Sequence, residues 1–362
     1  MKILLVEPFF GGSHRQWAEG LQQHSQHQIE LLTLSAHHWK WRMHGAAVTL
    51  VNQFLALNFQ PDLVLVSDML DLATFLGLTR QNLGNTPIAV YFHENQLTYP
   101  WSPTDQAPKR GYDSHYKFIN YTTALSADWC LFNSNYNMQS FLGALPSFLS
   151  MFPDHNNLRT VDNIKSKSQV LHLGLDLSSF DQHKPLVNTK SEAPILLWNH
   201  RWEYDKGPEE FFEALFELKA QQIDFRLVVL GESTNKYPKI FDTAQEHLKS
   251  EILHWGYCAS QAEYVQWLWK ADILPVTSHQ DFFGGSIIEA IYCNTTPLLP
   301  KRLAYPEHFP QNLEFFYEED CFLATLAQLI QTKQVSDLSS LVSQYDWSVL
   351  IQQYDTAFQN LL

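Results

Sequence analysis

The sequence predicts an α/β protein made of two consecutive Rossmann-like, doubly wound domains. Short runs of aliphatic and β-branched residues alternate with amphipathic segments along the whole chain, which is typical of parallel sheets covered by helices on both faces. The 362 residues suffice for about two such domains, each with its own core. Because ligands in such folds lie at the carboxyl ends of the strands, we expect the two domains to face a central cleft.

The first series of strands begins at the start of the sequence. Residues 1–8 reach Glu7 and Pro8 too soon to contain the apolar core of a signal peptide, so we interpret this segment as a first strand. The strands expected in this half are Ile3–Val6, Ile29–Leu34, Leu63–Ser67, Ile88–His93, Trp129–Asn133 and Gln169–Leu173. The helical patterns between them include Ala47–Phe59, Tyr116–Ser126 and Asn135–Leu149.

A second series follows a polar stretch near the middle of the chain. Its expected strands are Ile195–Asn199, Arg226–Leu230, Ile252–Gly256, Ile273–Thr277 and Thr296–Leu299, and its expected helices are Pro208–Gln221, Tyr237–Lys249, Gln261–Ala271 and Ser286–Tyr292. We therefore expect an N-terminal domain over residues 1–177, a linker over 178–192 and a C-terminal domain over 193–345. Residues 346–362 have the pattern of one further helix, which we expect to pack back across the domain junction.

Composition narrows the class of protein. Hydrophobic residues make up 45% and charged residues 17% of the chain, which is typical of a globular protein and excludes a disordered one. No apolar run approaches the ~18 residues that a membrane-spanning helix needs, and the four cysteines lack the spacing of metal ligands. We expect a cytoplasmic protein with reduced core thiols and no association with a membrane.

The net charge of −14 is unevenly distributed. Residues 1–175 contain 11 basic and 12 acidic side chains, whereas the remaining residues contain 13 basic and 26 acidic ones. A polyanion is therefore repelled by the C-terminal half and tolerated only by the N-terminal half. A solvated acidic surface on the C-terminal half explains the same numbers without any ligand.

The clearest chemical signal is the segment Asn199–Pro208, which follows an expected strand and precedes an expected helix. Arg201 and Lys206 place two cations on this one loop, at the carboxyl edge of the second sheet. Two cations in this place can neutralise a pyrophosphate and stabilise it as a leaving group. A solvated surface loop is the alternative interpretation.

A second signal is the segment Asp281–Ala290, which lies between an expected strand and an expected helix. Its glycines allow a ligand to approach the backbone, and the amides of Gly284–Ser286 at a helix N-terminus favour an anion. Glu289, one turn into the helix, can bind a ribose diol, and Asp281 can reach the hydroxyls of a sugar. The alternative makes Asp281 a helix cap and Glu289 a surface residue.

The N-terminal half contains a comparable strand end, Glu7–His14, in which Gly11 and Gly12 are adjacent. Ser13 is the expected N-cap of the helix that follows. The backbone at the two glycines can face the phosphate of a donor across the cleft.

The two C-terminal motifs together resemble the C-terminal domain of the large family of retaining glycosyltransferases with the GT-B fold. That family has an Arg…Lys-Gly loop for a diphosphate and, further along, two acids separated by seven residues, here Asp281 and Glu289. The family usually has Glu at the first of these positions, so Asp281 is a departure that shortens the side chain by one methylene. Gly231-Glu232 and Gly256–Cys258 stand at strand ends where the family seats its nucleotide base.

Motifs in the first half narrow the resemblance to the family of tRNA-queuosine mannosyltransferases. They are Glu7–His14, Ser35–Met43, Ser67–Met69 and Tyr91–Leu97, and the resemblance covers nearly the whole chain. It implies an enzyme that transfers mannose from GDP-mannose, with retention, to a hydroxyl on the cyclopentene-diol of queuosine in a tRNA anticodon loop. It also implies that no metal or other cofactor is required, and that His93 contacts the donor sugar.

Together with this resemblance, the motifs predict three groups of site residues. The expected catalytic residues are Arg201, Lys206, His93 and Asp281. The expected donor-binding residues are Gly11, Gly12, Gly284, Gly285, Ser286, Glu289, Gly231, Glu232 and Tyr257. The expected acceptor-binding residues are His14, Trp39, Trp41, Arg42, Glu94 and Asn95. No carboxylate is an obvious covalent nucleophile, so a same-face displacement, in which the leaving phosphate helps deprotonate the acceptor, is favoured over a double displacement.

Cations and aromatic rings alternate in three segments of the nearly neutral half: His37–Arg42, Lys109–Tyr112 and His115–Lys117. Unstacked RNA bases stack on aromatic and Arg side chains while cations hold the backbone, so these segments suit a tRNA. Ordinary surface loops with partly buried Trp side chains explain the same pattern.

Three other functions are compatible with these motifs. A glycosyltransferase of the same fold can act on a small-molecule or lipid-linked glycan, although an acidic protein without a basic amphipathic helix suits a lipid poorly. A nucleotide-sugar sensor binds the donor without turnover, and a nucleotide-sugar epimerase releases a free epimer. Product analysis separates these possibilities.

Overall fold

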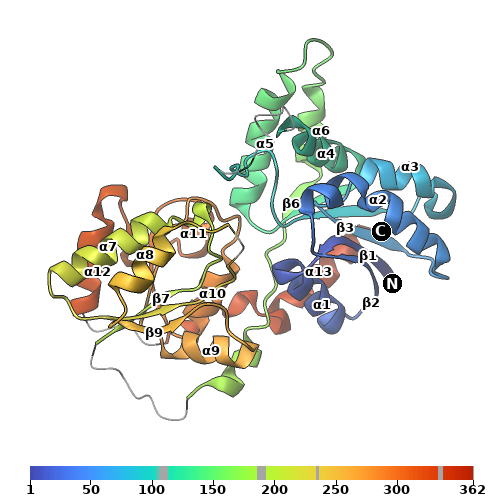
Figure 1. The fold of residues 1–362 in the computed structure, drawn as a ribbon. Helices are drawn as coiled ribbons and strands as arrows, with labels where there is room; N and C mark the ends of the chain where they lie inside the picture. The colour runs from blue at the N-terminus through green and yellow to red at the C-terminus, as the bar shows by residue number, and fades with distance from the viewer. Residues whose placement is uncertain (104, 106–112, 186–192, 234–235, 333–336, 362) are drawn as a thin grey trace. The chain divides into compact units, whose positions relative to one another are not determined.

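The computed structural model describes residues 1–103, 105, 113–185, 193–233, 236–332 and 337–361. It divides into two compact units (Figure 1): unit 1 is Met1–Leu175 with Trp347–Leu362, and unit 2 is Asp176–Asp346. Each unit is built on a six-stranded sheet, and every strand pair in the described part of the chain is parallel. This is the α/β architecture that the sequence predicts.

In unit 1 the strand order is β2-β1-β3-β4-β5-β6. The strands are β1 (Lys2–Phe10), β2 (Gln28–Ser35), β3 (Leu63–Ser67), β4 (Ile88–Phe92), β5 (Trp129–Phe132) and β6 (Ser168–Val170). The helices are α1 (Gly12–His24), α2 (Trp39–Ala56), α3 (Leu72–Leu83), α4 (Asp113–Ser126), α5 (Asn135–Leu149), α6 (Arg159–Ser166) and α13 (Trp347–Asn360). Val6 of β1 is level with Val66 of β3, which is level with Val90 of β4, so the carboxyl ends of these strands meet at one edge.

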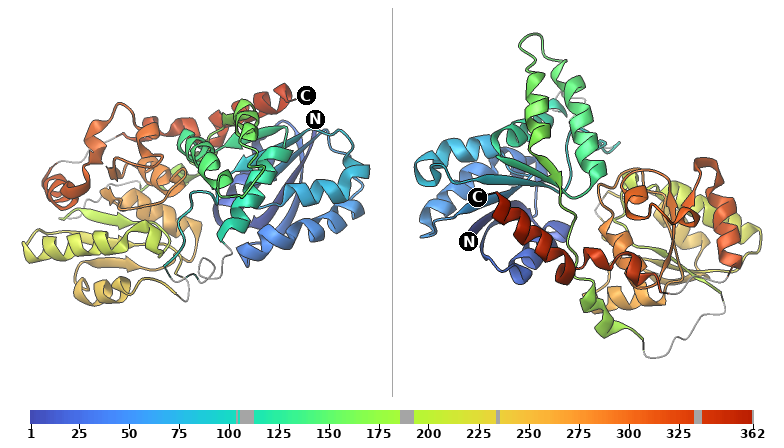
Figure 2. Two further views of the ribbon diagram at one scale, coloured as in Figure 1. Left: turned by 90° about the horizontal axis from the view of Figure 1, so that it is seen from above. Right: turned by 180° about the vertical axis from the view of Figure 1, so that it is seen from behind.

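Both faces of this sheet are covered, which explains why β1 is an almost continuous apolar run. On one face, Leu4 and Val6 belong to a core that includes Phe54 of α2 and Phe75 of α3. On the other, α1 and α13 lie side by side (Figures 1 and 2), and Trp17 Nε1 of α1 donates to the hydroxyl of Tyr354 of α13 at 3.0 Å.

In unit 2 the strand order is β12-β11-β10-β7-β8-β9. The strands are β7 (Ile195–Trp198), β8 (Arg226–Val229), β9 (Ile252–Trp255), β10 (Ile273–Pro275), β11 (Thr296–Pro300) and β12 (Phe316–Tyr317). The α-helices are α7 (Pro208–Ala220), α8 (Ile240–His247), α9 (Gln261–Lys270), α10 (Gly285–Tyr292), α11 (Tyr305–His308) and α12 (Phe322–Gln331). Short 3-10 helices are η2 (Ser178–His183), η3 (Tyr204–Lys206), η4 (Leu313–Phe315), η5 (Glu319–Cys321), η6 (Ser339–Leu341) and η7 (Ser343–Tyr345).

Aromatic rings dominate the core on one face of the second sheet. Helices α7, α8 and α12 cover this face, and α9 and α10 lie on the other (Figure 1). Trp198 of β7 lies against Phe211 of α7, with ring centroids 5.0 Å apart, and Trp202 stacks on Phe241 of α8 at 4.3 Å. Trp202 therefore anchors the loop after β7 to the core.

The chain passes from unit 1 to unit 2 after Leu175 and returns after Asp346. The two crossing segments are hydrogen-bonded to each other within each unit. In unit 2, Asp346 Oδ2 accepts a hydrogen bond from Ser178 N at 2.6 Å. In unit 1, Trp347 N donates to Leu175 O at 2.9 Å. Within the expected linker over 178–192, η2 packs on unit 2, because Phe180 O accepts from Trp269 Nε1 of α9 at 3.0 Å. Residues 186–192 lie outside the described residues.

Trp347 is clamped against two glycines of unit 1. A Cβ added at Gly20 would lie 2.1 Å from Trp347 Nε1, and one added at Gly174 would lie 2.5 Å from the same ring system. Only residues without a side chain allow the indole to lie this close to both backbone segments. The first residue of α13 is thereby fixed to unit 1.

Two local expectations are wrong. Helix α1 begins at Gly12 with Gly11 as its N-cap and has no side-chain cap bond, because the turn places Ser13 inside the first helical turn, where it is exposed. Cys130, Cys258 and Cys293 are buried as expected, but Cys321 is exposed in η5. None of the helices that the structure describes is both long enough and apolar enough to cross a membrane.

Candidate active site

The loop after β7 is held in shape by two glycines with left-handed backbone. Gly207 has φ 64°, and a Cβ there would lie 2.4 Å from the carbonyl oxygen of Thr277. Gly231, at the end of β8, has φ 105°, and a Cβ there would lie 2.0 Å from the carbonyl oxygen of His200. Pro208 then occupies the first turn of α7, where its missing N–H carries no cost. These close contacts fix the positions of His200 and Lys206.

Lys206 and Asp281 form a buried ion pair at the carboxyl edge of this sheet. Lys206 Nζ donates to Asp281 Oδ1 at 2.9 Å and to Gln280 O at 2.6 Å, and it lies 3.4 Å from Asp205 Oδ2. Asp281 Oδ2 accepts from the hydroxyl of Tyr305 at 2.6 Å. The structure thus joins two residues that are 75 positions apart and that the sequence predicts to be catalytic.

Both members of this pair are charged. Burial lowers the pKa of Lys206, but its attraction to Asp281 and Asp205 outweighs burial, and the net pKa is raised. Burial raises the pKa of Asp281, but the charge of Lys206 and the hydrogen bonds from Tyr305 and Lys206 outweigh it, and the net pKa is lowered. An anion that binds here contacts Lys206, whose charge is already partly balanced by Asp281 and Asp205. To be held, the anion must therefore accept hydrogen bonds from Lys206 or from neighbouring donors.

Arg201 and His200 lie on the same loop in different environments. The Arg201 side chain is 55% exposed and its Nη1 lies 3.2 Å from Glu203 Oε1. His200 is buried, and its Nδ1 is 3.3 Å from Ser286 Oγ. Burial lowers the pKa of His200 to about 4, so the ring is neutral. Its Nε2 is buried without a hydrogen-bond partner. His200 is not among the site residues expected from the sequence. Its position between a strand end and Arg201 is the signal that could have placed it at the site.

The start of α10 has the geometry of an anion site. Gly284 is its N-cap with φ 86°, and Gly285 and Ser286 are its first residues. Asn199 Nδ2 of the loop after β7 donates to Ser286 O at 2.7 Å, which ties this helix end to that loop. The first N–H groups of a helix have no partner within the helix and attract negative charge.

Glu289 is a partly buried acid and not a fully exposed surface residue. Its Oε2 accepts from the hydroxyl of Tyr264 of α9 at 2.7 Å. Burial raises the pKa of Glu289 to about 7, against the hydrogen bond from Tyr264, which lowers it. The carboxyl group therefore changes charge near neutral pH. Tyr264, which holds it, gives no signal in the sequence.

The expected base-binding residues lie at the end of β8, which pairs with β7, and at the end of β9, which pairs with β8. Glu232 is exposed, and its carbonyl oxygen accepts from Trp202 N at 3.1 Å. Gly256 has φ 113°, and the next side chain, Tyr257, is 76% exposed. An exposed phenol ring beside a backbone turn offers a flat face to a nucleobase.

In unit 1, the carboxyl ends of β1, β3 and β4 bring together Gly11, Gly12, His14, Asp68 and His93. Gly12 has φ 52°, and a Cβ at Gly11 would lie 2.4 Å from the Cβ of Ala36. His93 N donates to Asp68 Oδ1 at 2.8 Å, and the rings of His14 and His93 lie 4.1 Å apart. Three sequence motifs, Glu7–His14, Ser67–Met69 and Tyr91–Leu97, thus meet in one cluster.

Two groups of three side chains in the described residues offer ligand atoms within 4.8 Å of one another: Glu7, His14 and His93, and His254, Cys258 and Glu263. In the first group the two imidazole rings are tilted by 35° with centroids 4.1 Å apart. In the second, His254 Nε2 lies 3.1 Å from the Gly256 carbonyl oxygen, and His254 Nδ1 lies 3.9 Å from Glu263 Oε1.

Glu94 and Asn95 are placed differently in the loop after β4. Glu94 is partly exposed, and its Oε1 accepts from Gln96 Nε2 at 2.8 Å. Asn95 is fully buried: its Nδ2 donates to Asn137 Oδ1 at 2.9 Å and its Oδ1 accepts from Thr98 N at 3.0 Å. These bonds give Asn95 a structural role in shaping the loop.

An aromatic surface lies at the start of α2. Trp39 is half-buried against Trp101 and Tyr116, with ring centroids 6.4 Å and 5.1 Å away. Trp41 is 65% exposed, and its ring lies on Gly45, where an added Cβ would be 2.8 Å from it. One face of the Trp41 ring is thereby seated on the helix, and the indole is presented to the outside.

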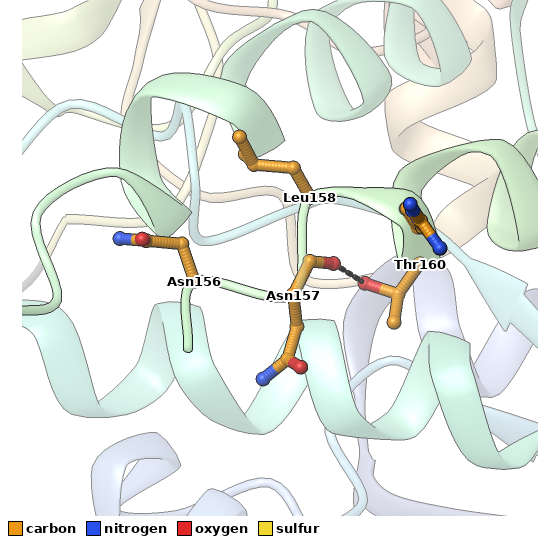
Figure 3. A pocket seen from close by; sticks show the side chains of 5 residues that line it. Asn156, Asn157, Leu158 and Thr160 are labelled. Atoms are coloured by element: carbon orange, nitrogen blue, oxygen red, sulfur yellow. Dashed lines mark hydrogen bonds between the residues drawn. The ribbon is translucent and has the colours of Figure 1, made fainter. Parts of the chain in front are cut away.

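The remaining acceptor-side residues do not all contribute to this surface. Arg42 Nε donates to Ser35 O at 3.1 Å, which ties α2 to the end of β2. The expected cationic segment Lys109–Tyr112 lies outside the described residues. A shallow pocket between α5 and α6, lined by residues 156–160, is shown in Figure 3; there Thr160 Oγ1 donates to Asn157 O at 2.7 Å. This pocket contains none of the expected site residues.

Comparisons with known proteins agree with this arrangement. Residues 2–175 match the family described as tRNA-queuosine alpha-mannosyltransferase N-terminal, and residues 179–343 match glycosyl transferases group 1. Over 316 residues, the chain is 34% identical to the tRNA-queuosine alpha-mannosyltransferase of Drosophila melanogaster, an alignment that spans 85% of this chain and 82% of that protein.

Two solved structures resemble the whole chain. Sucrose-phosphate synthase from Thermosynechococcus elongatus is 16% identical with a TM-score of 0.72, covering 100% of this chain and 99% of that one. HepE of Anabaena in complex with UDP is 14% identical with a TM-score of 0.66, covering 99% of this chain and 100% of that one. These likenesses show the fold, which is GT-B. Taken with the family matches, they establish that the chain belongs to the family of tRNA-queuosine alpha-mannosyltransferases and is a hexosyltransferase.

Proposed function

We propose that this protein transfers mannose from GDP-mannose to the cyclopentene-diol of queuosine in a tRNA anticodon loop, with retention of the anomeric configuration. Membership of the family supports the sugar and the acceptor. The observation that carries the chemistry is the buried ion pair of Lys206 and Asp281, three residues before the N-cap of α10. A fixed cation near helix amides suits a diphosphate that leaves with a growing negative charge.

The donor is assigned to the carboxyl edge of the sheet in unit 2. Arg201, Lys206 and the amides at the start of α10 bind the diphosphate. Glu289 accepts hydrogen bonds from the ribose diol, as its carboxylate already does from Tyr264. The base lies over Tyr257, beside the turn at Gly231.

The transfer breaks the bond between the anomeric carbon and the diphosphate oxygen and forms a bond to the acceptor oxygen. Asp281 has one carboxylate oxygen bonded to Lys206 and the other to Tyr305, so it is poorly placed to attack the sugar. This supports a same-face displacement, in which the leaving diphosphate accepts the proton of the acceptor hydroxyl. Retention follows because the acceptor attacks from the side that the diphosphate leaves.

The acceptor is assigned to unit 1, whose residues 1–175 are nearly neutral in charge. His14, His93 and Glu94 offer polar groups at the sheet edge, and Trp41 offers an exposed ring on which an unstacked base can lie. The acidic charge of the chain lies mostly in the other unit, so this is the surface that a polyanion approaches at the lowest electrostatic cost.

The test is to incubate the purified protein with GDP-mannose and total tRNA, one sample containing queuosine and one lacking it. The tRNA is then digested to nucleosides for mass spectrometry. We expect a hexose on the queuosine nucleoside alone, and release of that hexose by an α-mannosidase but not by a β-mannosidase. Parallel samples with UDP-glucose in place of GDP-mannose test the donor and are expected to give no product.

The outcomes separate the alternatives. Absence of product despite GDP-mannose binding would point to another acceptor or to a sensor without turnover. Product with UDP-glucose but not GDP-mannose would overturn the donor. Release of the hexose by a β-mannosidase would overturn retention.

A further inference from the structure

A carboxylate that has no part in the proposed chemistry lies fully buried at the end of β1. Glu7 has no exposed surface. Its Oε1 accepts from Phe9 N at 2.8 Å, and its Oε2 lies 3.1 Å from His14 Nδ1. A buried ionised carboxylate is costly unless a cation and hydrogen bonds compensate it. His14 is the side chain in the described residues that can provide that charge to Glu7.

The ring of His14 also faces His93. The two rings lie 4.1 Å apart, and His93 is bracketed by Trp17 at 4.7 Å and Tyr91 at 4.8 Å. Two stacked imidazoles this close in a buried site do not both carry a charge. Because the Glu7 carboxylate is hydrogen-bonded to the ring of His14, His14 takes the proton and His93 stays neutral. The buried Nε2 of His93 has no hydrogen-bond partner.

The other charged groups around His14 either also raise its pKa or lie far from its ring. Asp68, after β3, and Glu94, after β4, both favour a charged His14. On α1 itself, Arg15 is paired with Glu19 on the exposed side of the helix. On α13, Asp355 is bonded to Ser25 and Gln26 at the opposite end of α1. Burial lowers the pKa of His14, but Glu7 outweighs burial and raises the pKa to about 9, whereas burial and His14 hold the pKa of His93 well below its usual range.

We propose that Glu7 is a positioning residue of the transferase. It holds His14 as an imidazolium with Nδ1 bonded inward, so that the remaining N–H, at Nε2, points away from Glu7 and donates to a substrate oxygen. The side chain of His14 is 10% exposed, whereas that of Glu7 is fully buried, so His14 is the member of the pair that a ligand can reach. The fixed charge on His14 keeps His93 neutral throughout the working pH range. This role rests on the proposed function, because it serves the same transfer.

The test is the pH–rate profile of Glu7→Gln between pH 5.5 and 9.5. The amide keeps an acceptor for His14 Nδ1 but removes the charge of Glu7, which is the largest influence that opposes burial. We therefore expect the pKa of His14 to fall to 6.5 or below, from about 9. At pH 7.5 the protonated fraction then falls about tenfold or more. We expect kcat to fall by this factor at pH 7.5 and to recover toward wild type at pH 5.5, with the alkaline limb moved from about pH 9 to below 6.5.

Two further variants separate charge from structure. Glu19→Gln removes a carboxylate from the exposed face of the same helix and is expected to leave the profile unchanged. His14→Gln keeps an N–H donor that does not titrate, so its activity is expected to be low and to lack the alkaline limb. Adding Glu7→Gln to His14→Gln should then cause no further loss. A Glu7→Gln profile with the same shape as wild type would overturn the proposal.

A measurement on the wild-type protein covers the case in which Glu7→Gln does not fold. The pKa of His14 is read by NMR of the full chain with labelled histidines, assigned by comparison with His14→Gln. A value near 9 is expected, and a value of 6.5 or below would overturn the proposal. This readout needs no turnover. Failure of the wild-type protein to modify queuosine tRNA would therefore count against the proposed function and leave the charge state of His14 as a separate result.

Discussion

Replacing Lys206 by Ala removes one side of the buried ion pair. Lys206 is 7% exposed, and its Nζ lies 2.9 Å from Asp281 Oδ1. At an effective dielectric constant of about 20, two unit charges at this distance attract each other by about 6 kcal/mol. Breaking a buried pair by removing one partner costs ~3–5 kcal/mol of stability. We expect Lys206→Ala to lower the free energy of unfolding by that amount. Because the leaving diphosphate also loses a fixed cation, we expect kcat to fall by about 10²–10³.

The two effects separate in a double variant. Lys206→Ala with Asp281→Asn removes both charges of this pair. The nearby Asp205 carboxylate still loses its cation, so only part of the lost stability should return. Turnover should not return, since the diphosphate still lacks its cation. Lys219→Ala is the matched control: Lys219 Nζ is also 2.9 Å from a carboxylate, that of Glu251, but the lysine side chain is 41% exposed. An exposed pair contributes at most ~1 kcal/mol.

The assay combines urea unfolding with initial rates at saturating GDP-mannose and queuosine tRNA. The urea unfolding curves show which variants are folded, and GDP binding, followed by calorimetry, measures the loss of the contact with the diphosphate. If Lys206→Ala kept a kcat near that of wild type, the assignment of the diphosphate to Lys206 would be wrong. If its stability were unchanged, the ion pair with Asp281 would not exist in solution.

Three further predictions concern other parts of the site. Affinity for GDP-mannose should increase as the pH rises through about 7. The reason is that burial raises the pKa of Glu289 to about 7, and only the ionised carboxylate accepts hydrogen bonds from both Tyr264 and a ribose diol. Calorimetry at pH 6 and pH 8 measures this difference in affinity, and Glu289→Gln should abolish it. Trp41→Ala should weaken binding of queuosine tRNA by about 1–3 kcal/mol while GDP binding is unchanged, and Trp41→Phe should keep most of the affinity; equal tRNA affinity for Trp41→Ala and wild type would exclude base stacking there. Gly231→Ala should lower the melting temperature and the GDP affinity, because its Cβ would lie 2.0 Å from the His200 carbonyl oxygen. Gly77→Ala is the control and should lower neither, because no atom lies within 4 Å of the Cβ added there. Similar melting curves for both variants would contradict the close contact at Gly231.

The strands that the sequence predicts well are those buried on both faces. The expected strand Leu63–Ser67 is β3 to the residue, because a run of five buried residues leaves no periodic alternative. Short edge strands are harder: β6 covers only Ser168–Val170 where Gln169–Leu173 was expected, and β12 has two residues, too few for any pattern. An edge strand is defined by one neighbour and not by its own composition.

The site residues also divide into those that a sequence motif predicts and those that only the fold reveals. Lys206, Asp281 and Glu289 are predicted because each stands in a motif beside a strand end. Tyr264 and Tyr305, which hold the two acids, are not, since they come from α9 and α11 and meet those acids only in the folded unit. The hydrogen bonds that orient a catalytic carboxylate have no signature along the chain.

The route of the chain, out of unit 1 and back into it, has a consequence for synthesis. Helix α13 is made only after all of unit 2, yet its buried residues Trp347, Leu350, Tyr354 and Phe358 complete one face of the first sheet. Unit 2 is continuous in sequence and can finish folding while unit 1 still exposes the face of α1 that binds α13. A nascent chain therefore passes through a state with an open apolar surface on unit 1, including Trp17 and the glycine groove for Trp347. Unit 1 is therefore completed only when α13 docks, so a ribosome-bound chain that stops before residue 347 should recruit chaperones to its first-made half.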